Sequence, residues 1–220
     1  MFTQRQVFTS SLLLLSLILA GCAGKQPPRY AGLSSAEQLR PNSGEDAYRQ
    51  PWRTAGQVDW KKYTTVTVDP VIVYQGADNQ FGDLSQADRQ ELADYLYQRC
   101  NEVLKTRFSP SQHPSPQALR IKLTLTGAET TTPVLGTFTK FDLAGGPYNI
   151  VQAVRGREGL MNGSVSYAVE IYQADNNQLL QAWVTKQYPN AMNVGASFGS
   201  LSAAKVGIDK GADQLLAVLK

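Results

Sequence analysis

The 220-residue sequence contains few of the residues that build catalytic and metal sites, with two cysteines and one histidine. Zinc sites typically use several histidine or cysteine ligands, so a zinc centre is not expected. The sequence also lacks the carboxylate-rich loop of a calcium site and the Gly-x-x-x-x-Gly-Lys-Ser/Thr loop that cradles phosphates. We therefore predict a protein with no metal, no cofactor and no catalytic residue.

Charge of one sign and long apolar runs are scarce as well. The chain has 21 basic and 18 acidic residues, and its basic residues form no run. Nucleic-acid-binding proteins concentrate basic residues on one face or stripe, so nucleic acid is not an expected partner. The one apolar run, near the N-terminus, is shorter than the roughly 20 residues that span a bilayer. A transmembrane helix is therefore not expected.

That apolar run, from Leu12 to Ala20, follows a weakly basic start and ends in small residues, as in a secretory signal peptide. The four residues Leu19-Ala-Gly21-Cys22, at the end of this run, resemble the lipobox of bacterial lipoproteins. The resemblance implies that residues 1–21 are a signal cleaved between Gly21 and Cys22, and that the Cys22 sulfur carries a diacylglyceryl group. The alternative is an ordinary signal peptide with a chance cysteine.

The lipobox resemblance also implies where the protein is placed. The amine of the cleaved cysteine is usually acylated too, and two or more acyl chains give stable anchoring where one does not. Ala23 follows the cysteine, where an aspartate would retain a lipoprotein in the inner membrane. We therefore expect an outer-membrane lipoprotein, lipid-anchored at Cys22, with its domain facing the periplasm. Cys100 then has no partner for an intramolecular disulfide, and its place on an apolar helix stripe predicts a buried core residue.

After the signal, the chain divides into a tether and one domain. Residues 22–57 are rich in Gly, Pro, Gln and Ser and show no periodicity, which predicts a lipidated tether. The apolar residues within this stretch could instead fix its later part onto the domain. Residues 58–220 are long enough for a single domain with a substantial core. Alternation and helical spacing predict these elements in it: strand 64–74, helix 84–108 capped by Ser85, strand 119–126, strand 164–173, strand 178–187 and helix 201–219.

The order of these elements defines the expected fold. A strand–helix–strand unit should be parallel and right-handed, whereas a hairpin is antiparallel. A mixed sheet with both helices on one face satisfies both conditions, so we predict an α+β fold, a two-layer α/β sandwich. In this prediction the second face of strand 119–126 is exposed to water, and Glu170 and Asp175 are surface carboxylates. The three tryptophans, Trp52, Trp60 and Trp183, are expected to pack in the core or to clamp the tether.

Three stretches resemble an uncharacterised lipoprotein family, domain of unknown function 3313: residues 30–35, 58–71 and 165–180. The second stretch, with Val58-Asp59-Trp60 and Asp69-Pro70-Val71, is the most specific. The resemblance spans nearly the whole mature chain, but it implies no assigned activity. The hairpin and terminal helix are more faintly similar to periplasmic domains of curli-secretion and penicillin-binding-protein-activator lipoproteins. Those domains bind partners, but architecture alone does not give function.

One sequence motif suggests an enzyme. Gly195-Ala-Ser197-Phe-Gly199 matches the Gly-x-Ser-x-Gly turn of serine hydrolases, in which a histidine follows the serine in the chain. The lone histidine, His113, precedes Ser197. We therefore favour a glycine-rich loop before the last helix.

Residues 136–163 are the expected contact surface, because they combine six glycines with many apolar residues and no sustained period. Phe138, Phe141, Arg155 and Arg157 are the candidate contacts. The alternative is that residues 148–154 form a short helix packed on the core. These patterns favour a non-enzymatic lipoprotein domain that binds an envelope protein. A hydrolase using Ser197 and a carrier of a small apolar ligand are the alternatives.

Overall fold

The computed structural model describes residues 25–111, 113–130, 145–155, 157–158, 163–191, 193 and 199–220. The helices in this part of the chain are η1 (Ala36–Gln38), η2 (Trp60–Lys62), α2 (Gln86–Leu104), α4 (Gly145–Val154) and α5 (Ser202–Val218). The strands are β1 (Arg40–Pro41), β2 (Trp52–Arg53), β3 (Thr65–Val68), β4 (Ile72–Val73), β5 (Ser109–Pro110), β6 (Ala118–Glu129), β7 (Ser164–Gln173) and β8 (Leu179–Gln187).

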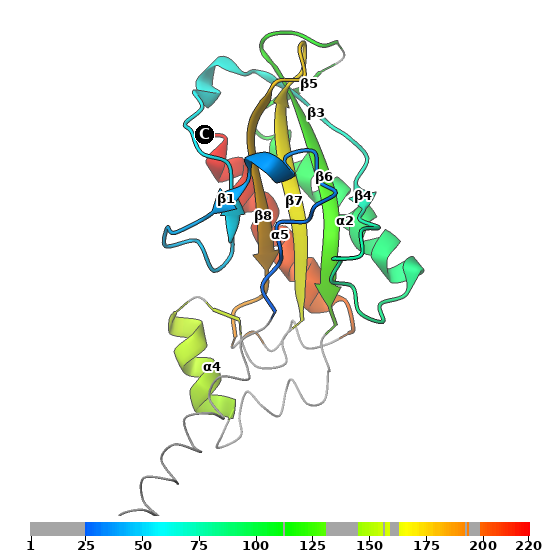
Figure 1. Cartoon of the computed structure of the whole chain (residues 1–220), viewed down its shortest axis with the longest axis vertical. Coiled ribbons are helices and arrows are strands. Elements are labelled where there is room, and N and C mark those ends of the chain that lie inside the picture. Colours follow the sequence, from blue (N-terminus) through cyan, green and yellow to red (C-terminus); the bar gives the residue numbers. More distant parts are fainter. Residues whose placement is uncertain are drawn as a thin grey trace, which may run out of the picture.

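The strands form one mixed sheet, in the order β1-β2-β8-β7-β6-β3-β5, with β4 also paired to β6 (Figure 1). β3 and β4 run parallel to β6, with α2 as the connection between them, and β6, β7 and β8 are antiparallel. Pro70 lies in the break between β3 and β4. Both the parallel unit and the hairpin expected from the sequence are confirmed.

The two long helices α2 and α5 cover one face of the sheet (Figure 1). α2 begins where the sequence predicts, because the Ser85 hydroxyl accepts a hydrogen bond from the Asp88 amide. Alternate residues of β6, from Leu119 to Leu125, point to these helices and are fully buried. The expected α+β fold, with a mixed sheet and both helices on one face, is therefore confirmed.

The main core contains three residues that the sequence placed there. Trp60 and Trp183 lie in it, and Cys100 is buried on the inner stripe of α2. Burial raises the pKa of the Cys100 thiol to about 12. Because the thiolate is the reactive form of cysteine, Cys100 is inert at neutral pH.

Two glycines set how closely α5 approaches the sheet. A methyl group on Gly207 would lie 2.8 Å from the Gln187 carbonyl oxygen, and one on Gly211 would overlap the Tyr167 hydroxyl. Gly207 and Gly211 lie one helical turn apart on the buried side of α5. Larger side chains at these positions would lift the helix from β7 and β8.

We expect Gly211→Ala to destabilise the domain by about 1–3 kcal/mol, the usual cost of overpacking a core. Helix propensity alone would give the opposite sign, a gain of about 1 kcal/mol. Urea denaturation measures the difference. Because Tyr167→Phe removes the overlapping oxygen, the double variant should recover part of the loss. A Gly211→Ala variant more stable than wild type would show that this helix contact is not tight.

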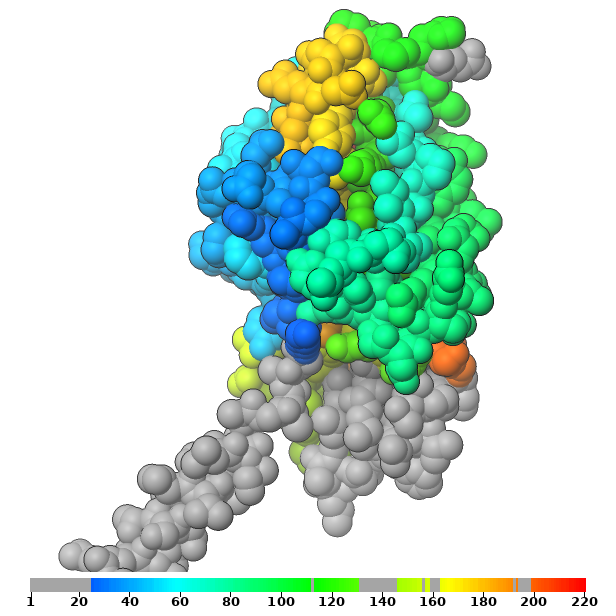
Figure 2. Space-filling model, turned by 45° about the vertical axis from the view of Figure 1, so that its right-hand side comes forward, coloured from blue at the N-terminus to red at the C-terminus, as the bar shows by residue number. Residues whose placement is uncertain are grey.

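The opposite face of the sheet is covered by the segment for which the sequence predicted a tether. From Lys25 onward this segment lies across β6, β7 and β8, and its strands β1 and β2 extend the sheet beyond β8 (Figures 1 and 2). Tyr30, Leu33 and Leu39 are buried in a second, smaller core. The described part of residues 22–57 is therefore a layer of the folded unit, in agreement with the alternative that its apolar residues fix it to the domain.

This covering segment corrects two expectations about the outer face. Thr124 and Thr126 of β6 are buried, so the face expected to be wet is largely covered. Glu170, expected to be a surface carboxylate, is fully buried. Its Oε1 accepts a 2.7 Å hydrogen bond from the Ser35 amide, and its Oε2 lies 3.4 Å from the Lys122 ammonium. The carboxylate thus fastens η1 to the sheet.

Candidate binding site at one end of the sheet

A polar buried site lies where β6 ends, β7 begins and β8 ends. Glu129 pairs with Ser164 in the sheet register, and Val165 pairs with Gln187, so these strand ends lie together. Lys186, the penultimate residue of β8, points to the outer face there and is almost fully buried. A buried ammonium must be paired and hydrogen-bonded to be tolerated, so its contacts organise the site.

The Lys186 ammonium joins four segments of the chain. Its Nζ lies 3.0 Å from Glu158 Oε2 and 3.4 Å from Glu129 Oε2. It also donates a hydrogen bond of 3.2 Å to the carbonyl oxygen of Lys25, the first residue that the structure describes. The start of the described chain, the segment after α4, the end of β6 and the end of β8 are therefore held at one point.

Burial also shifts the pKa of Glu158, one of the two acids in this cluster. Desolvation raises the pKa of Glu158, while the positive charge and hydrogen bond of Lys186 act in the lowering direction. Desolvation is the larger effect, so the ionised form of Glu158 depends on its pairing with Lys186.

Beside the buried cluster lies a hollow of about 400 Å³ with a basic excess. It is lined by six residues: Glu45, Asp46, Tyr48, Arg49, Arg155 and Arg157. The Arg157 guanidinium lies 4.1 Å from the centre of the Tyr48 ring. The side chain of Arg155 is exposed. The hollow thus presents three guanidinium groups against two carboxylates.

Arg49 is the most firmly held of the three arginines. Its Nη1 donates to Gln187 Oε1 at 2.9 Å, and its guanidinium lies 3.9 Å from the centre of the Tyr188 ring. Its carbonyl accepts hydrogen bonds from the Lys186 amide and the Thr185 hydroxyl. Burial lowers its pKa, and nearby Tyr188 and Glu158 act in the raising direction. Arg49 could not be found from the sequence, because it lies in the irregular segment predicted as a tether.

The structure brings together two of the four predicted contact residues. Arg155 and Arg157 share the hollow, whereas Phe138 and Phe141 lie outside the described residues. The short helix considered for residues 148–154 is present as α4. However, its Ile150, Val151 and Val154 belong to neither core of the described residues and are exposed.

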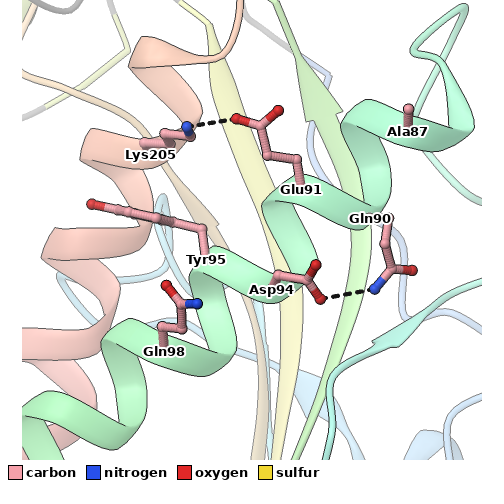
Figure 3. Close-up of a pocket in the computed structure, with 7 residues that line it drawn as sticks. All are labelled: Ala87, Gln90, Glu91, Asp94, Tyr95, Gln98 and Lys205. Atoms are coloured by element: carbon pink, nitrogen blue, oxygen red, sulfur yellow. Dashed lines mark hydrogen bonds and ion pairs between the residues drawn. The ribbon is translucent and has the colours of Figure 1, made fainter.

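A second hollow, of about 470 Å³, lies along α2 where it faces α5 (Figure 3). Its charged groups are partnered within the hollow or with the neighbouring helix. Lys205 pairs with Glu91 at 2.6 Å, Gln90 donates to Asp94, and the Tyr95 hydroxyl donates to Asp209. The Lys205–Glu91 and Tyr95–Asp209 contacts join α5 to α2, so this hollow is part of the packing between the two helices.

The residues that the sequence singled out for catalysis or lipid anchoring are not among the described residues of this buried cluster or of the two hollows. Gly21, Cys22 and Ser197 lie outside the described residues, and His113 is exposed in the loop before β6. In the part of the chain that the structure describes, no three His, Cys, Asp or Glu side chains gather into a metal-binding group. No helix in that part is long and apolar enough to cross a membrane.

We expect Ser197→Ala to change the free energy of unfolding by no more than about 0.5 kcal/mol, because the sequence predicts a glycine-rich loop there and such substitutions have small effects. We also expect no catalytic role for Ser197, because His113 precedes it in the chain, whereas a hydrolase of this type has its histidine after the serine. Thermal melts and labelling with a fluorophosphonate probe provide the measurement. Covalent labelling of wild type that Ser197→Ala abolishes would contradict the expectation.

An α+β domain with one helical layer, and an N-terminal segment folded over the other face, defines the class of protein. The chain belongs to the family described as "Protein of unknown function (DUF3313)", whose model matches residues 29–215. None of the curated proteins matches the chain.

Two solved structures show distant similarity. A PelC dodecamer from Paraburkholderia phytofirmans is 10% identical with a TM-score of 0.39, covering 76% of this chain and 94% of that chain. The hypothetical protein CT253 from Chlamydia trachomatis is 12% identical with a TM-score of 0.31, covering 71% of this chain and 98% of that chain.

Proposed function

We propose that this protein is an outer-membrane lipoprotein, anchored through Cys22, whose periplasmic domain binds another envelope protein and catalyses no reaction. The observation that carries the proposal is the hollow lined by Arg49, Arg155 and Arg157. It lies at the end of the sheet where the described chain begins, three residues after Cys22. A lipoprotein whose domain is held at this end presents the hollow close to its anchor.

The chemistry of the hollow indicates the kind of partner. Arginine presents a planar fork of donors that matches a carboxylate in bidentate geometry. The Tyr48 ring beneath Arg157 adds an aromatic surface, and arginine and tyrosine are enriched in protein interfaces. A partner segment that carries carboxylates is the occupant that these side chains favour. The flanking Glu45 and Asp46 would select against more extended acidic segments.

Photo-crosslinking in cells tests the proposal. A photoreactive amino acid in place of Arg155 should yield an adduct of defined mass, while the same group in place of exposed Lys61 should not. Adding Arg157→Glu to the protein with the photoreactive group at position 155 should lower the yield of the adduct several-fold. The new carboxylate would repel the carboxylates of the partner, which slows association and weakens the complex. Lys62→Glu is the matched control for the charge change and should leave the adduct intact. Equal crosslinking from positions 155 and 61 would contradict the proposed contact.

A further inference from the structure

The apolar side of α4 faces outward. Pro147, Ile150, Val151 and Val154 occupy positions i, i+3, i+4 and i+7, which form a single stripe on a helix. All four are exposed, with exposed fractions of 54% for Ile150, 45% for Val151 and 84% for Val154. The buried residues of the helix are Gly146 and Asn149. A helix on a soluble domain normally buries its apolar stripe, so this reversed orientation indicates that something else covers it.

The position of α4 indicates what that cover is. Glu158, which follows the helix, forms an ion pair with Lys186. The ammonium of Lys186 also donates a hydrogen bond to the carbonyl oxygen of Lys25. Figure 1 shows α4 beyond this end of the sheet. Lys25 is three positions after Cys22, and even a fully extended chain spans only about 11 Å over three positions. A lipid on Cys22 therefore brings the membrane surface to the end of the molecule that carries α4.

The charge beside the stripe suits the same surface. Arg155 is exposed directly after Val154, and Arg157 and Lys25 lie at the same end. Helices that lie in a membrane interface combine an apolar face with flanking basic residues, which are attracted to anionic headgroups. Such a helix lies in the plane of the bilayer and does not cross it, in keeping with the ten residues of α4.

We propose that the stripe Pro147, Ile150, Val151 and Val154 inserts into the headgroup region of the bilayer that holds the Cys22 lipid. This inference rests on the proposed function in one respect, the acylation of Cys22. The helix is then a second attachment that orients the domain, with α4 on the membrane and the opposite end of the sheet pointing into the periplasm. The arginine hollow lies at the rim of this contact, open to a partner that approaches along the membrane.

Fluorescence in reconstituted vesicles tests the inference. The full-length lipoprotein is purified from membranes, labelled with an environment-sensitive dye at Val154→Cys, and reconstituted into phosphatidylethanolamine–phosphatidylglycerol vesicles. Cys100 is buried and should not react. Ile72→Cys on β4 is the matched control, since Ile72 is also an exposed apolar residue, at 48%. We expect blue-shifted emission and quenching by brominated lipids at position 154 but not at position 72.

Each outcome separates the two proposals. Flotation of the protein with the vesicles reports on the acyl anchor, so failure to float would contradict the lipoprotein assignment. Flotation with the same water-like emission at both positions would leave the anchor in place and overturn the membrane contact of α4. A blue shift at position 154 that appears only in native envelopes, and not in lipid vesicles, would also overturn it, because a protein would then cover the stripe. As a second variant, Val151→Gln with Val154→Gln should abolish protection of α4 from added protease without preventing flotation.

Discussion

Replacing Lys186 with methionine should destabilise the domain by about 3–5 kcal/mol, the usual cost of breaking a buried ion pair by removing one partner. The Lys186 side chain is 2% exposed and that of Glu158 is 11% exposed, so the carboxylate left behind would be buried without its cation. The carbonyl of Lys25 would also lose its hydrogen bond from the ammonium. Urea denaturation followed by tryptophan fluorescence measures the change.

An exposed pair provides the matched control. Lys205 and Glu91 approach to 2.6 Å, but their side chains are 35% and 54% exposed. Because solvent-exposed pairs contribute little, Lys205→Met should cost less than about 1 kcal/mol. Adding Glu158→Gln to Lys186→Met should recover part of the stability, since the unpaired charge is then removed. Equal effects of the two lysine substitutions would mean that Lys186 is not the joint between the four segments.

The pH dependence of the Lys186→Met variant follows from the acid it leaves behind. Burial already raises the pKa of Glu158, and loss of the lysine removes the main opposing influence, so this pKa should rise further. A carboxyl whose pKa is higher in the folded state stabilises the fold at low pH, and that stability is lost as the pH rises through the folded pKa. The deficit relative to wild type should therefore shrink as the pH falls from neutral towards the ordinary carboxyl range, about pH 4–5.

The central strands of the sheet and the helices α2 and α5 could be predicted from the sequence because their signals are local. Alternation along β6 and β7 and the helical spacing of α2 each occur within a dozen residues, and Ser85 marks a helix start by its own side chain. The turn between β7 and β8 is likewise local, with Asn177 at a positive φ of 55°. The parallel and antiparallel connections follow from the order of these elements.

The outer face could not be predicted, because its signals are distant along the chain. The Ser35 amide and the Glu170 carboxylate are separated by 135 residues, and nothing near Glu170 shows that it will be covered. Tyr30, Leu33, Ala36 and Leu39 are buried at every third residue, a spacing that matches neither the α-helical nor the strand period and so predicts no such element. Strand β2 pairs with β8 through only two residues, too short a stretch to show alternation.

The candidate site shows the same limit. Lys186 contacts groups from three other segments that are far apart in sequence, so the sequence does not distinguish it from an exposed lysine of a strand. For α4, the sequence shows many apolar residues but no sustained period over residues 136–163, and it does not show the direction in which the apolar side of the helix faces. The direction depends on what the domain leaves uncovered, which only the folded arrangement shows.

Replacing Cys22 with alanine should release the protein from the outer membrane. In the proposed lipoprotein the diacylglyceryl group is carried by the Cys22 sulfur, so the alanine variant has no atom to which this lipid can be attached. The membrane contact proposed for α4 would be a weak attachment by itself, because interfacial binding scales with the small apolar area it buries. Fractionation in sucrose gradients should place wild type with outer membranes and most of the variant elsewhere.

A control separates loss of the anchor from loss of the fold. The variant should retain the wild-type far-ultraviolet circular dichroism and urea midpoint, because Cys22 precedes the described domain. Cys100→Ala should remain in the outer-membrane fraction, since its thiol is buried in the core. Retention of Cys22→Ala in the outer membrane at wild-type levels would argue that another feature anchors the chain.

We expect the mature protein to begin at an acylated Cys22. Mass spectrometry of the protein extracted from membranes in detergent tests it most directly. The expected N-terminal peptide starts at Cys22 and carries the mass of a diacylglyceryl group, with an additional acyl chain on its amine where the organism adds one. A peptide that retains residues 1–21, or one with an unmodified cysteine, would contradict it.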